Sequence, residues 1–132
     1  MMAGFAWKWE TKNNKDAFDI VIEGIPKRWN STQKDWVNSA NAVNEVGCIH
    51  TVQGYDLNYG FVILGPDIYY DSDKDSVYVN KANFKDAVAK KKASDDDLRK
   101  IIVNAYYVLM TRGMLGTYLY VCDPALKEYL SR

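Results

Sequence analysis

Several features are scarce in this 132-residue chain, and each absence excludes a class of protein. No apolar run approaches the ~20 residues that a membrane-spanning helix needs, so we expect no membrane partner. The N-terminus, MMAGFAWKWE, lacks the basic stretch and long apolar run of a signal peptide. With one His and two cysteines, Cys48 and Cys122, that lack Cys-x-x-Cys spacing, we expect reduced core thiols, no metal site and a cytoplasmic location.

A charge excess is also missing, because 17 Lys and Arg balance 17 Asp and Glu. Nothing therefore draws the whole chain to nucleic acid or to an anionic membrane, although a local basic patch remains open. What the chain does have is 48% hydrophobic and 14% aromatic residues, enough for a core. We expect one domain over residues 1–132, belonging to a longer protein because an aromatic, strand-like run begins almost at once.

The residue patterns predict strands that alternate with helices. Short β-branched or aromatic runs predict strands at Gly4–Glu10, Asp19–Glu23, Val46–Thr51, Phe61–Leu64, Ile68–Tyr70, Val77–Val79 and Thr117–Val121. Capping residues and apolar periodicity predict helices after Asn30-Ser31, over Lys81–Lys92, from Ser94 through Leu109, and over Ala125–Leu130. Phe61–Leu64 is apolar on both faces, as in a central parallel strand, and Thr117–Val121 is predicted to be buried. Ile68–Tyr70 and Val77–Val79 are predicted to form a hairpin around the polar turn Asp71–Ser76. The alternation favours an α/β layer fold with a mainly parallel sheet.

One loop with ligand-binding chemistry lies between the predicted strands Val46–Thr51 and Phe61–Leu64. Thr51 offers a hydroxyl, Gly54 allows close backbone approach to a phosphate, and Asp56 offers a carboxylate. In open α/β sheets, ligands bind beyond the carboxyl ends of the strands, where we expect both this loop and a second loop, which contains Arg112, to lie. The alternative is an ordinary polar turn.

A second candidate loop contains Arg112, which stands between the apolar runs Val108–Met110 and Thr117–Val121. A cation fixed between two buried elements needs an anionic partner. A guanidinium suits a phosphate because its donors form a rigid planar fork. The alternative is a structural salt bridge to a local acid such as Asp123.

Taken together and in order, the two loops resemble motifs V and VI of superfamily 1 helicases and translocases. The strings are HTVQGYDLNYGFVILGPD and NAYYVLMTRGMLGTYLYV. Nearly the whole chain, from AGFAWKW to DPALKEYL, more closely resembles the C-terminal part of the Schlafen-type, group 3-like family of ATP-binding, helicase-like proteins. The resemblance implies a three-layer RecA-like domain of the P-loop NTPase type. The phosphate-binding loop itself, Gly-x-x-x-x-Gly-Lys-[Ser/Thr], is missing here.

The resemblance also implies roles for seven residues. Arg112 matches the arginine finger that neutralises charge on the transferred phosphoryl group, and is the implied catalytic residue. The implied nucleotide-binding residues are Gln53, Gly54, Asp56 and Thr111, and the implied nucleic-acid-binding residues are Thr51 and His50. Asp56 stands where such motors often carry Glu, and its shorter reach puts a ribose contact in question. His50 also has a purely structural alternative.

The implied function is that of the second half of an ATP-dependent DNA or RNA helicase or translocase. The N-terminal RecA-like domain of the same polypeptide would complete the site for ATP and Mg²⁺, and this chain alone would bind neither. Tyr106 and Tyr107 stand where related sequences often carry a basic residue, so one phosphate contact is missing. The alternative is a non-catalytic nucleic-acid- or protein-binding module derived from a helicase fold.

Two other features have both a structural and a functional interpretation. The four tryptophans could stack on the bases of a single strand, but such residues more often pack between sheet and helix. They are Trp7, Trp9, Trp29 and Trp36. Lys90–Lys92 could contact a phosphate backbone, but three Asp follow shortly afterwards, which is more typical of a solvated helix end.

Overall fold

A computed structural model describes all residues from Met1 to Arg132 and contains one six-stranded sheet with helices packed on it. The strand order is β2-β3-β4-β1-β5-β8. Their bounds are β1 Met2–Ala3, β2 Ile20–Ile22, β3 Ile25–Trp29, β4 Glu45–Cys48, β5 Leu57–Leu64 and β8 Gly113–Val121. Only the β2–β3 pair is antiparallel, so the predicted α/β fold with a mainly parallel sheet is confirmed.

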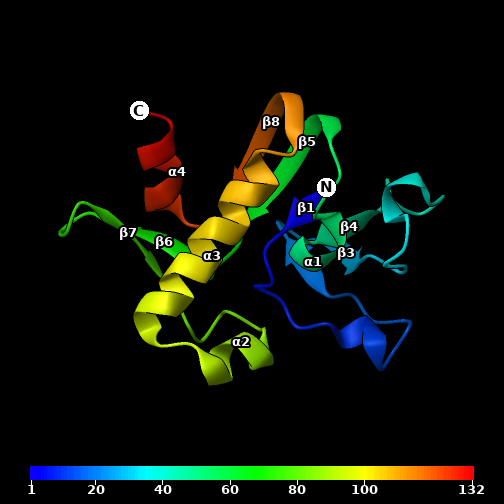
Figure 1. Cartoon of the computed structure of the whole chain (residues 1–132), viewed down its shortest axis with the longest axis horizontal. Coiled ribbons are helices and arrows are strands. Elements are labelled where there is room, and N and C mark those ends of the chain that lie inside the picture. The colour runs from blue at the N-terminus through cyan, green and yellow to red at the C-terminus, as the bar shows by residue number, and fades with distance from the viewer.

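The helices lie along one side of this sheet (Figure 1). They are α1 Ile49–Val52, α2 Ala87–Lys92, α3 Asp95–Met110 and α4 Pro124–Leu130, with short 3-10 turns at Glu10–Lys12 and Trp36–Asn38. The long helix α3 crosses the middle of the molecule and packs on β5 and β1, while α1 packs on β4 and β1. The buried residues of α3 are Leu98, Ile102, Tyr106 and Leu109, at the helical spacing expected from the sequence. No helix is long and apolar enough to cross a membrane.

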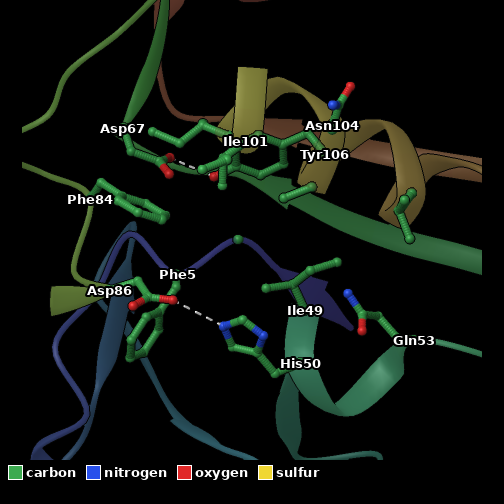
Figure 2. A pocket seen from close by; sticks show the side chains of 14 residues that line it. Phe5, Ile49, His50, Gln53, Asp67, Phe84, Asp86, Ile101, Asn104 and Tyr106 are labelled. Carbon is green, nitrogen blue, oxygen red and sulfur yellow. Dashed lines mark hydrogen bonds and ion pairs between the residues drawn. The ribbon is translucent and has the colours of Figure 1, made fainter. Parts of the chain in front are cut away.

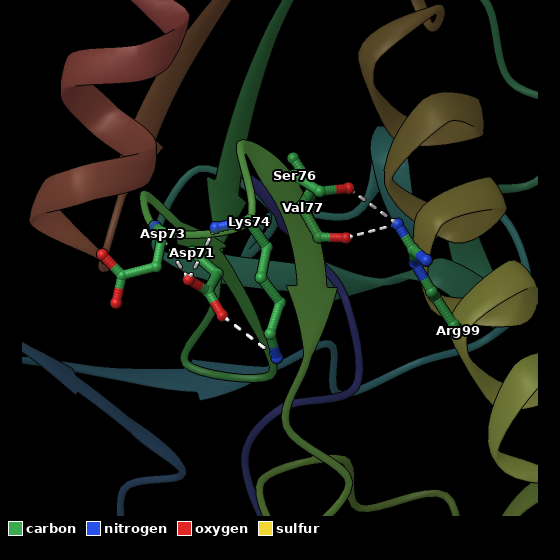
Figure 3. Close-up of polar contacts among 6 residues, drawn as sticks. All are labelled: Asp71, Asp73, Lys74, Ser76, Val77 and Arg99. Carbon is green, nitrogen blue, oxygen red and sulfur yellow. Dashed lines mark hydrogen bonds and ion pairs between the residues drawn. The ribbon is translucent and has the colours of Figure 1, made fainter.

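The predicted hairpin is confirmed as β6 (Ile68–Asp71) and β7 (Ser76–Val79), and the carboxylate of Asp71 stabilises the turn between them (Figure 3). Asp71 Oδ1 accepts from the backbone N–H groups of Asp73 and Lys74, and Asp71 Oδ2 lies 3.5 Å from Lys74 Nζ. Arg99 of α3 donates to Ser76 Oγ and to the carbonyl of Val77 at 3.2 and 2.7 Å. The hairpin is thereby fixed to α3.

Several predicted elements differ from the structure at the N-terminal half. Gly4–Glu10 is not a strand, because its alternating aromatic residues turn inward to pack around Trp29, with ring centroids 5.7 to 6.4 Å away. No α-helix follows Asn30-Ser31; only Trp36–Asn38 forms a 3-10 turn, after Asp35 in a left-handed conformation. The strand predicted over Val46–Thr51 ends at Cys48, where α1 begins.

In the C-terminal half, the predicted helix over Lys81–Lys92 forms only from Ala87, because the side chain of Asp86 caps it there. The predictions of a helix from Ser94, with Ser94 as its cap, and of a helix ending at Leu130 are confirmed. β8, predicted as a buried strand, lies at the sheet edge, where Tyr118 is 60% exposed.

The sheet face opposite α3 has no helix over β5 and β8. Phe61 and Tyr118 are paired neighbours on that face and stack with ring centroids 4.9 Å apart. Both side chains remain more than half exposed, as does Tyr59. The third layer of the predicted three-layer arrangement is therefore not supplied by these 132 residues over this part of the sheet.

Candidate functional site

Arg112 lies in the short connection between α3 and β8, held by backbone carbonyls. Its Nε donates to the carbonyl of Val108 at 3.1 Å, and Nη1 donates to the carbonyl of Tyr55 at 3.4 Å. The hydroxyl of Thr111 accepts from Nη2 at 3.4 Å and itself donates to the Val108 carbonyl. These contacts fix the guanidinium, whose side chain is 23% exposed.

The salt bridge to a local acid that the structural alternative predicted is present, but the acid that faces Arg112 is Asp56 rather than Asp123. Arg112 Nη1 lies 3.6 Å from Asp56 Oδ1, and the Asp56 side chain is 69% exposed. Asp123 instead caps α4 by accepting from the backbone N–H of Leu126. Because exposed ion pairs contribute little to stability, the Asp56–Arg112 contact leaves the guanidinium available to a stronger anion.

The structure brings the two sequence-predicted loops together. The backbone N–H of Leu57 donates to the carbonyl of Arg112 at 2.9 Å, and Leu57 pairs with Gly113 where β5 and β8 begin. A Cβ at Gly113 would collide with the backbone of Gly60 and Gly116, so only glycine permits this close pairing. The meeting point is at the amino ends of β5 and β8, and the expectation that both loops lie at carboxyl ends is wrong for Arg112.

The other residues of the first loop occupy different environments along the connection from β4 to β5. Thr51 is only 7% exposed, within the buried side of α1. Gly54 has φ of +85° with open space around it, so its backbone conformation rather than crowding favours glycine. His50 and Gln53 are exposed and line a cavity, with His50 Nε2 3.3 Å from Asp86 Oδ2.

That cavity, of about 300 Å³, lies where β1, β4 and β5 end (Figure 2). Phe5, Ile49 and Phe84 form much of its apolar wall, and Asp67 and Tyr106 lie across from His50 and Asp86. Gln53 and Val108 line it as well, so it adjoins the Arg112 contacts. This position agrees with the rule that ligands bind beyond the carboxyl ends of strands.

A buried acid–phenol pair forms the inner wall of the cavity. Tyr106 Oη donates to Asp67 Oδ1 at 2.5 Å and accepts from the backbone N–H of Gly65 at 2.9 Å. Asp67 is 1% exposed and its Oδ2 has no hydrogen-bond partner. Burial raises the pKa of Asp67 to about 6, against the smaller opposing effect of the Tyr106 hydrogen bond. Burial, followed by the charge of Asp67, raises the pKa of Tyr106 well above its ordinary value.

Sequence reasoning missed Asp67 and Tyr106 as site residues. A signal for Asp67 was present, because an acid three residues after a buried parallel strand lies at the edge where ligands bind. Tyr106 reads as one more apolar position of α3, and only the packing of α3 against β5 brings its hydroxyl to Asp67.

No group of three or more His, Cys, Asp or Glu side chains is placed to hold a metal ion. Both cysteines are free thiols, and burial raises the pKa of Cys122 to about 11. Burial also raises the pKa of Cys48, so neither sulfur favours the reactive thiolate.

Comparison with known proteins places this geometry in a family. The model of the family "Schlafen group 3, DNA/RNA helicase domain" matches residues 1–123, which include both loops and the whole sheet. The chain belongs to the Schlafen group 3 helicase-domain family. No solved structure matches it.

One similar relative of this Schlafen group 3 domain is the uncharacterized protein YPL245W of Saccharomyces cerevisiae. The two are 41% identical over 129 residues, which cover 91% of this chain. The match covers only 28% of the yeast protein's length. The family match ends at Asp123, so α4 lies outside it.

Proposed function

We propose that this Schlafen group 3 domain is the second RecA-like half of an ATP-dependent DNA or RNA helicase or translocase. Its Arg112 would act on ATP held between this domain and an N-terminal RecA-like domain of the same polypeptide. The observation that carries the proposal is the fixed guanidinium of Arg112, which lies beside Asp56 where the two motif-like loops meet. The family match supports a helicase-related origin.

The geometry suits a group that stabilises developing negative charge. Two carbonyls and one hydroxyl hold Arg112, so little reorganisation is needed when an anion arrives. The exposed Asp56 can give way to a phosphate, because a phosphate accepts two parallel hydrogen bonds from one guanidinium. In this proposal Thr111 positions Arg112, while Gln53 and Gly54 face the nucleotide and Asp56 lies near it.

The rest of the nucleotide site belongs to the other half. In such motors the first half carries the phosphate-binding loop and the acid that holds Mg²⁺, and the second half closes over the nucleotide. We therefore expect the 132-residue chain alone to hydrolyse no ATP. The implied nucleic-acid contacts of Thr51 and His50 stay part of the proposal, and Thr51 would have to become accessible from its buried position.

Arg112→Ala in the whole protein tests the proposal. ATP hydrolysis should fall by about 10³ or more on the arginine-finger precedent, because the charge on the transferred phosphoryl group loses its neutralising partner. Arg112→Lys should recover little, since an ammonium lacks the planar fork. Turnover is measured under saturating ATP, together with nucleotide binding.

Arg132→Ala is the matched control, because Arg132 is an exposed arginine 3.9 Å from Glu128 in the last turn of the chain. It should leave turnover unchanged. An Arg112→Ala protein that keeps wild-type turnover would remove Arg112 from the mechanism. A folded whole protein without any ATP turnover would favour the non-catalytic binding module instead.

A further inference from the structure

A second cavity, of about 510 Å³, opens beyond the carboxyl end of β3, away from the cavity lined by Asp67. Residues 9–15 form one side, and residues 28–33 form the other. The lining is mostly polar and contains three cationic side chains, Lys12, Lys15 and Arg28. All three are exposed. Arg28 already donates to the carbonyls of Ala17 and Asp16, so the ammonium groups of Lys12 and Lys15 are the charges open to a ligand.

Two buried acids at this basic cavity, Glu45 and Asp19, are committed to internal hydrogen bonds. Glu45 is the one acid in the lining, and its Oε2 accepts from the backbone N–H of Ser31 and from Trp36 Nε1. Asp19 accepts from Thr11 and from the backbone N–H of Trp29. Both acids are 8% exposed, so the carboxylates are covered while the cations remain open.

One buried donor at this cavity also lacks a partner. Trp29 is 1% exposed and lines the cavity, and its indole Nε1–H has no partner. Ser31 and Gln33 add a hydroxyl and an amide to the lining. A site with exposed cations and with hydroxyl and amide groups in its lining fits an anion that carries several acceptor oxygens.

An aromatic surface lies directly beside these cations. The ammonium of Lys12 lies 4.4 Å from the centroid of the Trp9 ring, and Trp9 packs against Trp29 at 5.7 Å. Trp9 is half-buried, so part of its ring faces outward. Cations that follow a phosphate backbone beside an aromatic ring that stacks on a base are the combination that single-strand-binding grooves use.

We propose that this basic cavity binds a phosphate group of a single-stranded nucleic acid, with Trp9 available to the adjacent base. The choice of a nucleic acid as the polymer rests on the proposed function. The choice of a phosphate rests on the cavity itself, because its cations and polar groups favour an anion with several oxygens. The cavity lined by Asp67 does not fit this role, because Asp67 and Asp86 face it.

The experiment measures binding of a short fluorescein-labelled oligothymidylate to the 132-residue chain by anisotropy over a series of salt concentrations. The Lys12→Gln/Lys15→Gln variant should bind roughly tenfold or more weakly at low salt. The slope of log affinity against log salt should fall by about 0.7, because the neutralisation of one single-strand phosphate is lost. Both lysines are exposed, and the circular dichroism spectrum should stay that of the wild type.

Lys100→Gln/Lys127→Gln is the matched control, because it removes the same charge from exposed positions of α3 and α4. It should leave both affinity and slope unchanged. An equal loss in this control, or wild-type affinity in the Lys12→Gln/Lys15→Gln variant, would overturn the site.

Inorganic phosphate and ATP serve as competitors that distinguish a strand from a free phosphate ligand. Weak competition by both, with tight oligothymidylate binding, supports the strand. ATP binding that depends on Lys12 and Lys15 without any oligothymidylate binding would overturn the assignment to nucleic acid. ATP turnover of the whole protein is a separate measurement, so failure here and failure of the Arg112 proposal can be told apart.

Discussion

Asp67 is the residue whose surroundings most alter its chemistry. Its carboxyl is 1% exposed, holds one hydrogen bond from Tyr106 and has a pKa of about 6 against an ordinary 3.8. Since the folded-state pKa is the higher one, folding favours the protonated form. The stability that this protonation provides is present in full below about pH 3.8 and is lost as the pH rises through about 6.

Asp67→Asn should remove this pH dependence. Between pH 4 and 7 the wild-type free energy of unfolding should lose roughly 2 to 3 kcal/mol from this one group, since each unit of pKa corresponds to ~1.4 kcal/mol. The variant should lose much less over the same range, because its amide oxygen can still accept from Tyr106 and it carries no charge. Urea unfolding at several pH values measures the difference.

Asp73→Asn is the control for this comparison, because Asp73 lies in the exposed hairpin turn rather than beside the cavity. It should retain the wild-type slope of stability against pH between pH 4 and 7. Equal slopes for wild type and Asp67→Asn would show that Asp67 titrates like an ordinary carboxyl.

Among the elements, α3 links the proposed chemistry to the core. Its N-terminal turn begins at Ser94, whose Oγ accepts from the backbone N–H of Asp97 at 3.2 Å and donates to Asp97 Oδ2 at 2.6 Å. Three Asp residues in the first turn interact favourably with the positive end of the helix dipole. Its other end leads directly to Thr111 and Arg112, so the helix positions the guanidinium.

Ser94→Ala should lower the free energy of unfolding by about 1 kcal/mol, because the cap of α3 is lost. Thermal unfolding followed by circular dichroism measures the change. Ser72→Ala, in the exposed hairpin turn, is the matched control and should change stability little. A Ser94→Ala protein as stable as the control would mean that the first turn of α3 contributes nothing to the fold.

Across the whole molecule, helices cover the two faces of the sheet to different extents. One face is covered by α1 and α3, while the face with Tyr59, Phe61 and Tyr118 is open beside the edge strand β8. Contiguous exposed apolar residues and an unpaired edge both favour association between molecules.

Phe61→Thr/Tyr118→Thr should therefore raise the solubility of the 132-residue chain. Stability should change little, because both side chains are more than half exposed. Light scattering at increasing protein concentration measures the onset of association. Tyr107→Ala, at a 64% exposed position on α3, is the control and should have a smaller effect. Unchanged association in the double variant would argue against this face as its cause.

The sequence by itself determined the local elements whose signals are complete within a few residues. Ser94 and its three following acids start α3, Asp123-Pro124 starts α4, and the polar turn between β6 and β7 makes the hairpin. It also determined the family, because the match over residues 1–123 depends on the amino-acid sequence alone.

Only the tertiary structure decided which residues face one another. Alternation in Gly4–Glu10 looks like a strand, but the aromatic rings gain more by packing on Trp29 than by pairing in a sheet. The partner of Arg112 is Asp56 because parallel pairing of β5 and β8 aligns their amino ends. Asp67 meets Tyr106, 39 positions later, because α3 packs on β5. Such pairings depend on how distant segments pack, and no local pattern specifies them.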